Sequence, residues 1–100
     1  MSVEENVKLG ELIDIYGNLL SEKQKLAISQ YIELDLSLSE IAESENITRS
    51  GAYDAIQKAK EKLYNYEEKL KVYYIKTRLR EIMQDEKSIK ENLAKLLEEI

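Results

Sequence analysis

A short stretch, 48-TRSGAYDAIQ-57, carries side chains whose types and spacing suit contacts to nucleic acid. If it opens a helix that enters a major groove, its early exposed residues face the base edges. Arg49 can form two hydrogen bonds to a guanine edge and Gln57 two to an adenine edge, whereas the hydroxyl of Thr48 and the helix N-terminus suit a phosphate. The candidate nucleic-acid-binding residues are Thr48, Arg49, Ser50, Tyr53, Gln57 and Lys58.

These side chains also have explanations that need no partner. Thr48 is required as a helix cap even in a protein that binds nothing. Lys58 follows Asp54 by four residues, so the two can pair on one helix face, and a carboxylate there repels phosphate. Residues 48–62 hold four basic and two acidic residues, a net charge of +2 that predicts weak, salt-sensitive nonspecific affinity. Both interpretations stay open on the sequence.

A second basic surface is predicted farther along the chain. The net charge is −5, yet residues 69–80 contain five basic residues and no acid, so a local positive surface can still meet an anionic partner. Cations beside tyrosines suit RNA backbone and stacking contacts, and they equally suit an acidic protein surface or plain solvation. The members of this possible second basic surface are Lys69, Tyr73, Lys76 and Arg80.

The residues for catalysis are missing. The chain has no histidine and no cysteine, and it shows no glycine-rich phosphate loop and no metal-ligand set. We therefore predict a non-enzymatic protein with no cofactor, no metal and no small-molecule substrate. No apolar run approaches the length of a membrane span and the N-terminus does not resemble a signal peptide, which predicts a cytoplasmic protein with no membrane insertion.

The elements that position these side chains are predicted to be helices only. There is no proline and there are three glycines, while leucine, glutamate, lysine and alanine are abundant, which favours an all-α chain. Serine capping boxes at Ser21 and Ser37 open the second and third helices. The predicted helices cover about 4–19, 22–34 and 38–45, then a long one from Thr48 to the low eighties and a last one after a bend at 84–88. We predict a helix-turn-helix domain over residues 1–66, with its motif at about 38–57, and a helical extension over 67–100 that is continuous with the same domain.

The turn between the third and fourth helices makes specific demands. Ala42 must be small because the two helices cross there, and Asn46 must reverse the chain, as a residue that tolerates the left-handed conformation. Thr48 then caps the fourth helix. Gly51 costs about 1 kcal/mol relative to alanine inside a helix. Two explanations of this glycine stay open: close approach to a phosphate backbone, or a helix that simply starts loosely.

The long helix is apolar on two sides. One stripe is predicted to pack on the N-terminal helices and contains Ala52, Ile56, Ala59, Leu63, Tyr66, Leu70 and Tyr74. A second stripe lies nearly opposite and contains Val72, Ile75, Leu79, Ile82 and Met83. Exposed apolar stripes of that size are uncommon, so we expect either the C-terminal helix or a second copy of the chain to cover the second one.

The pattern resembles known families. Residues 20–63 look like the DNA-binding region of sigma factors that reads the −35 promoter element, their region 4. The whole chain resembles the YlxM-like family of small bacterial helix-turn-helix proteins, through the segments LIDIYGNLLSEKQ, SLSEIAE, AYDAI and YEEKL. The resemblance implies a DNA-binding or regulatory protein that acts in the signal recognition particle pathway. Glu45 departs from the pattern, because such motifs usually place an apolar residue there.

The first functional hypothesis is a DNA-binding helix-turn-helix regulator, with DNA favoured over RNA. The alternative is an adaptor that binds the protein or the RNA of the signal recognition particle without reading DNA. A third hypothesis combines them, with one surface for each partner, and a homodimer is an option in all three. The sequence specifies neither a target site nor a protein partner.

Overall fold

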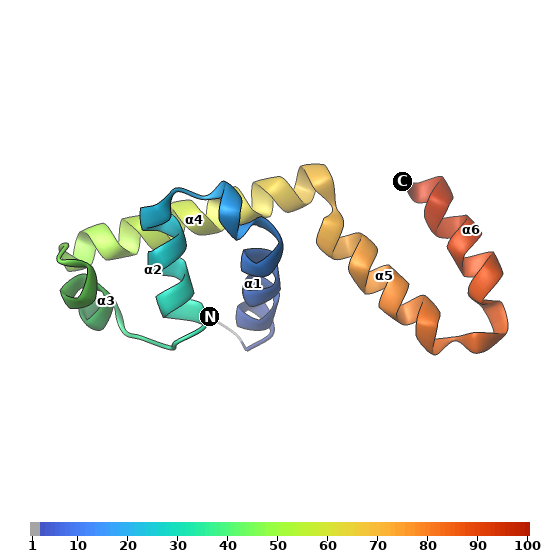
Figure 1. Ribbon diagram of the computed structural model, residues 1–100, viewed down its shortest axis with the longest axis horizontal. Helices are drawn as coiled ribbons and strands as arrows, with labels where there is room; N and C mark the ends of the chain where they lie inside the picture. Colours follow the sequence, from blue (N-terminus) through green and yellow to red (C-terminus); the bar gives the residue numbers. More distant parts are fainter. Residues whose placement is uncertain (1–2) are drawn as a thin grey trace.

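The structure, a computed structural model, describes residues 3–100, with the side chain of Lys87 left out. These residues form six α-helices and two short 3-10 helices and contain no strand, which confirms the predicted all-α class (Figure 1). The elements are α1 (Val3–Tyr16), η1 (Gly17–Leu19), α2 (Glu22–Ile32), α3 (Leu38–Glu45), α4 (Arg49–Leu70), α5 (Val72–Gln84), η2 (Glu86–Ser88) and α6 (Ile89–Glu99).

Both serine capping boxes are present. The Ser21 hydroxyl accepts the Gln24 amide at 3.2 Å, and the Gln24 side chain accepts the Ser21 amide in return. Ser37 and Glu40 form the same reciprocal pair at 3.1 and 3.0 Å. Each box supplies partners for amides that a helix start otherwise leaves unpaired, so these two serines fix where α2 and α3 begin.

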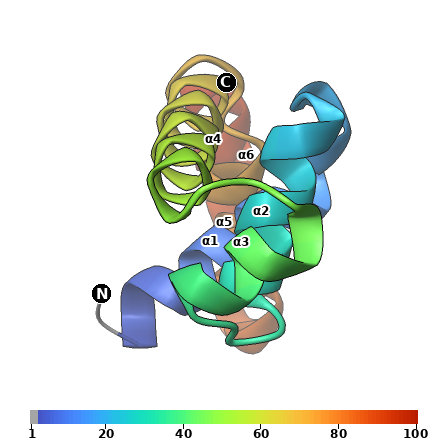
Figure 2. The same ribbon diagram turned by 90° about the vertical axis from the view of Figure 1, so that its left-hand side faces the viewer.

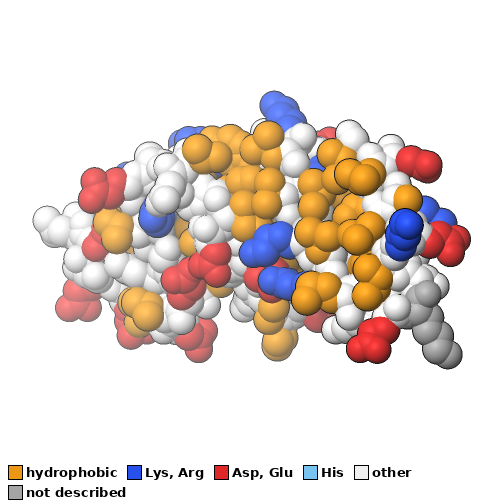
Figure 3. Space-filling view, turned by 45° about the vertical axis from the view of Figure 1, so that its right-hand side comes forward, with side chains coloured by type: hydrophobic (Ala, Val, Ile, Leu, Met, Phe, Trp, Pro, Cys, Tyr) orange, Lys and Arg blue, Asp and Glu red, His pale blue; other side chains and the backbone are white. Residues whose placement is uncertain are grey.

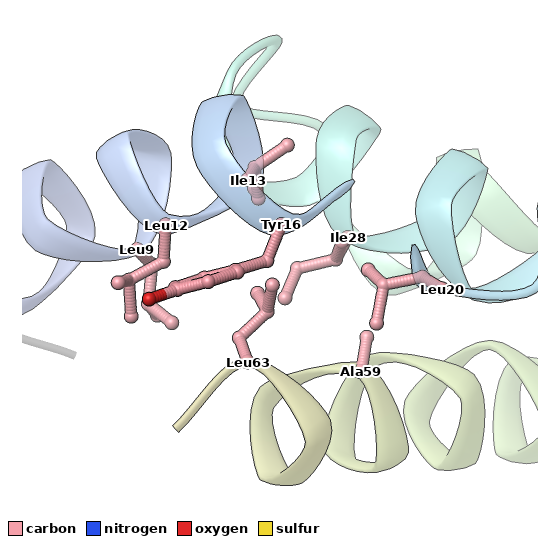
Figure 4. Packing of buried hydrophobic residues seen from close by; sticks show 8 residues of the cluster. All are labelled: Leu9, Leu12, Ile13, Tyr16, Leu20, Ile28, Ala59 and Leu63. Atoms are coloured by element: carbon pink, nitrogen blue, oxygen red, sulfur yellow. The ribbon is translucent and has the colours of Figure 1, made fainter. Parts of the chain in front are cut away.

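Two buried clusters hold α1 to α4 together. The first joins α1, α2 and α4, whose side chains converge in Figure 4, and consists of Leu9, Leu12, Ile13, Tyr16, Leu20, Ile28, Ala59 and Leu63. The second joins α2, α3 and α4 and consists of Ala27, Ile41, Ala42, Ala52, Ala55 and Ile56. Seen end-on, α4 runs away from the viewer along one side, with α3 in front and α2 opposite (Figure 2). The long helix α4 is therefore the element on which both clusters are built.

The predicted continuous helix from Thr48 to the low eighties is wrong. Lys71 adopts a left-handed conformation, with φ of 55°, and separates α4 from α5. The Glu67 carboxylate accepts the amides of Tyr73 and Tyr74, both at 3.0 Å, and the Tyr16 hydroxyl accepts the amide of Val72 at 3.1 Å. These bonds cap a new helix start with groups from α4 and α1, so α5 can begin although no proline or glycine interrupts the sequence.

The same break divides the first apolar stripe. Its members from Ala52 to Leu63 are buried and Tyr66 packs against the first cluster, as predicted. Leu70 and Tyr74 lie beyond the part of α4 that contacts α1 and α2, and both are exposed. Our prediction that the whole stripe packs on the N-terminal helices is therefore wrong for its last two members.

The second apolar stripe is covered in part by α6. The bend at η2 turns the chain back, so that α5 and α6 form an antiparallel hairpin at one end of the molecule (Figure 1). Ile82 of α5 and Leu96 of α6 are buried in it. The molecule measures 53 × 22 × 18 Å, and no helix among residues 3–100 is long and apolar enough to cross a membrane. The division into parts at residue 66 stays a prediction.

Candidate nucleic-acid interface

The turn between α3 and α4 is made by a single left-handed residue. Asn46 has φ of 54° and ψ of 47°. The amide of Ile47 donates to the Ala42 carbonyl at 2.9 Å, and that of Asn46 donates to the Glu43 carbonyl at 3.3 Å. These are the two bonds of a Schellman motif, which pair the last carbonyls of α3. Ile47 then packs against the second cluster, so the direction in which α4 starts is fixed.

Alanines form the contact between α3 and α4. Ala42 on α3 and Ala52 and Ala55 on α4 are all buried in the second cluster, while the need for a small residue at Ala42 stays a prediction. Side chains this small allow two helix backbones to approach closely. The helix-turn-helix is thus a packed unit over residues 38–57 and not a straight rod.

Thr48 caps α4, and Gly51 fits the cap. The Thr48 hydroxyl accepts the Gly51 amide at 2.9 Å, so the start of α4 is not loose. A Cβ on Gly51 would lie 3.1 Å from the Thr48 hydroxyl oxygen, which is closer than ordinary packing allows. A tight cap is therefore a third explanation for this glycine, in addition to close approach to a phosphate.

The predicted reading residues lie together on the first turns of α4. Thr48, Arg49, Ser50, Tyr53 and Lys58 are exposed, and Gln57 is half-buried. Arg49 is fully available to a partner, whereas Gln57 is only partly exposed. These side chains are therefore accessible, while their role in binding stays a prediction.

Three of the lysines of α4 have partners within the chain. Lys58 pairs with Asp54 at 3.1 Å, as the four-residue spacing indicated. Lys60 lies 6.0 Å from the centre of the Tyr31 ring, and Lys62 donates to the Gln24 side chain at 3.0 Å. Arg49 forms no ion pair with any residue that the structure describes. Of the four basic residues within residues 48–62, Arg49 is thus the most available for a phosphate or a base.

The second basic surface is not one stripe. Lys69 lies on α4, whereas its three other members lie on α5, beyond the break at Lys71. Tyr73 packs against the first cluster, and Arg80 pairs with Glu11 of α1 at 3.3 Å. Those four positions were expected on one face of an unbroken helix, and the helix is broken at Lys71. That they form a binding surface together stays a prediction.

The return of α6 alongside α5 creates a groove that the sequence did not predict. A hollow of about 590 Å³ lies where α4 ends, α5 begins and α6 ends, and its lining includes Lys69, Lys71 and Tyr74. The Tyr74 hydroxyl donates to Glu99 at 2.6 Å, and Arg78 pairs with the same carboxylate at 3.5 Å. The bond to Glu99 raises the pKa of Tyr74 above its ordinary value. The Tyr74–Glu99 contact joins residues 25 positions apart, so no local pattern indicated the groove.

Comparison with known proteins assigns the family. The family model described as "Putative helix-turn-helix protein, YlxM / p13 like" matches residues 3–100. A UPF0122 protein of Fusobacterium nucleatum is 44% identical over 102 residues, which cover 100% of this chain and 99% of the relative. A UPF0122 protein of Clostridium perfringens strain 13 is 36% identical over 97% of this chain and 93% of its own length. One of Malacoplasma penetrans is 46% identical over 87% of this chain and 80% of its own length. The predicted membership is confirmed: the chain belongs to the UPF0122 family of YlxM/p13-like helix-turn-helix proteins.

Proposed function

We propose that this chain is a non-enzymatic DNA-binding regulator that reads a major groove through the start of α4. One observation supports the proposal above all others: the first turns of α4 are exposed, while the opposite side of the same turns is fixed to α3 through buried alanines. A reading helix must be both accessible and rigidly held, since contacts to base edges depend on sub-ångström positioning.

The N-terminus of α4 suits a phosphate. Its first turn contains no acidic residue, so the positive end of the helix dipole is not neutralised locally. Asp54 is the nearest acid on the reading side, and its pairing with Lys58 reduces the repulsion that it would exert on DNA. Arg49 then provides the principal positive charge, and Gln57 a bidentate contact to adenine.

Weak, salt-dependent affinity is expected from this charge distribution. Residues 1–66 hold seven basic and twelve acidic residues, and three of the four basic residues in 48–62 have partners within the chain. Few phosphates can be neutralised, so the affinity depends on base contacts more than in a strongly basic reader.

The test is a salt-titrated binding assay with purified protein and a pool of random duplexes, followed by selection of preferred sequences. Arg49→Ala should weaken binding to a selected site by about 1–3 kcal/mol and relax the preference at one base pair. Lys95→Ala, which removes an exposed charge of α6 that pairs with Glu91, is the matched control and should have little effect. Equal losses in both variants, or no binding at low salt, would exclude the reading mechanism.

An adaptor of the signal recognition particle is the second candidate. The groove lined by Lys69 and Lys71 favours it, because this surface is built where α4 ends and the α5–α6 hairpin begins, away from the start of α4. The resemblance to the YlxM-like family supports a role in that pathway. Binding to the particle's RNA or protein should then be insensitive to Arg49→Ala and reduced by Lys69→Glu, which reverses a charge in the lining of the groove. The opposite pattern would favour the DNA reader.

A further inference from the structure

The α5–α6 hairpin buries few of its own apolar side chains. Ile82 and Leu96 are buried, but Met83 and Leu97 are each 75% exposed and Ile100 is 71% exposed. In the space-filling view, hydrophobic side chains gather in the half of the molecule that contains the hairpin (Figure 3). A two-helix hairpin is too thin to enclose a core alone, so this surface needs another layer.

The exposed apolar side chains lie on one face of the hairpin. On α5, Val72, Leu79 and Met83 recur at helical spacing, and on α6 Leu93 and Leu97 do the same. On each helix the exposed stripe is rotated in the same sense, along the chain, from the buried residue, which is Ile82 on α5 and Leu96 on α6. Because the two helices run antiparallel, this common rotation brings both stripes to the same side (Figure 1). The hairpin is thus amphipathic as a unit.

The start of the chain does not cover this face. α1 contacts α5 through Tyr73, which packs against the first cluster, and through the Arg80–Glu11 pair. Tyr73 and Arg80 lie about a quarter turn from the apolar stripe of α5, at 100° per residue. The edge of α5 that meets α1 is therefore distinct from the exposed apolar face.

The charges of the hairpin identify what fits it. Within the hairpin, residues 72–80 hold three basic residues and no acid, whereas residues 81–100 hold six acidic and three basic ones. Within one chain the Arg78–Glu99 pair already joins α5 to α6 at 3.5 Å. A surface with one basic and one acidic half is complementary to a copy of itself rotated by 180°.

We propose that this face is a homodimer interface, in which two hairpins pack face to face as a four-helix bundle, α5 of one copy beside α6 of the other. Two helical hairpins that share an apolar core are a stable arrangement of this size. The inference goes beyond the proposed function and does not depend on it, since the start of α4 lies at the other end of the molecule (Figure 1). A dimer would carry two such helix starts, at its two ends.

The test is the oligomeric state of the full chain without nucleic acid, by sedimentation velocity from about 1 to about 100 µM, a range that covers ordinary dimer affinities. The wild type should be dimeric at the upper concentrations. The double variant Met83→Glu with Leu97→Glu should raise the dissociation constant at least about 100-fold, because each charge enters the interface twice. Leu34→Glu is the matched control: Leu34 is 65% exposed after α2, far from the hairpin, and its replacement should leave dimerisation unchanged.

Two results would overturn the inference. A wild type that stays monomeric throughout the range would exclude a second copy as the occupant, whatever the variants do. A double variant that dimerises as the wild type does would assign the interface to another surface. Far-UV circular dichroism should give equal helicity for all three proteins, because the replaced side chains are mostly exposed in one copy.

Discussion

Glu67 is predicted to be the residue on which the junction between α4 and α5 depends. Its carboxylate accepts three hydrogen bonds, from the Tyr16 hydroxyl at 2.8 Å and from the amides of Tyr73 and Tyr74 at 3.0 Å each. Both amides belong to the first turn of α5, where a helix has no internal acceptors for them. A negative charge at a helix start is also favourable to the helix dipole. Glu67→Ala removes all of these interactions at once.

The expected loss of stability follows from the number of bonds and their exposure. A hydrogen bond to a charged group contributes about 1.5–3 kcal/mol when it is buried. Glu67 is only half-buried, and the two amides can bind water once the carboxylate is gone. The proton of the Tyr16 hydroxyl loses its acceptor, which is more costly because Tyr16 is 2% exposed, although the hydroxyl oxygen still accepts the Val72 amide. We therefore expect a loss of about 2–4 kcal/mol for Glu67→Ala.

The assay combines urea unfolding with native-state hydrogen exchange. The loss should be local at first, with the amides of Tyr73 and Tyr74 losing protection while those of α2 and α4 near Ile28 and Ala59 keep theirs. Glu68→Ala is the control, because Glu68 is exposed at the neighbouring position. The reasoning is refuted if Glu67→Ala and Glu68→Ala have the same unfolding free energy, or if the Tyr73 and Tyr74 amides stay protected.

Two further predictions concern pH. Burial, followed by the hydrogen bond to Glu67, raises the pKa of Tyr16 above its ordinary value of 10.0. The stability from this tyrosine is therefore complete below pH 10.0 and is lost as pH rises through the higher native pKa, so Tyr16→Phe should flatten the alkaline fall in unfolding free energy measured by urea titration. At acid pH, the backbone amide and the hydroxyl of Ser37 hold the pKa of Glu40 below its ordinary value of 4.5. The stability that the ionised Glu40 carboxylate adds is present above pH 4.5 and is lost as pH falls through the lower native pKa. The melting temperature of Glu40→Gln should therefore fall less at acid pH than that of the wild type. Equal acid dependence in the two proteins would contradict the capping argument.

Local signals determined the helix-turn-helix. The capping serines, the left-handed Asn46 and the capping Thr48 act over three or four residues, so their effect is readable without knowing what lies across the fold. The alanines that line the crossing followed from the same geometry. This is why the starts of α2, α3 and α4 and the exposure of the α4 start were predictable. The ends were less so: α1 ends at Tyr16 and α2 at Ile32, before the predicted residues 19 and 34.

The junction at Lys71 was not predictable in this way. The local sequence favours a helix across it, and the chain there has no proline, no glycine and no serine or threonine cap. The bonds that start α5 come from Tyr16, 56 residues away from Val72, and from Glu67 on the preceding helix. A carboxylate that caps a helix from outside it looks, in the sequence, like any other exposed glutamate.

The sequence by itself determined the all-α class, the helix-turn-helix, the first-turn residues of α4 and the presence of two apolar stripes. The reason is that caps, turns and periodicity act within a few residues along the chain. Only the tertiary structure decided that the long helix breaks, that Arg78 and Arg80 pair with carboxylates of different helices, and that α6 covers part of the second stripe. Those outcomes depend on contacts between residues that are distant in the sequence and that only folding brings together. Examples are Tyr16 with Glu67, Arg80 with Glu11 and Arg78 with Glu99.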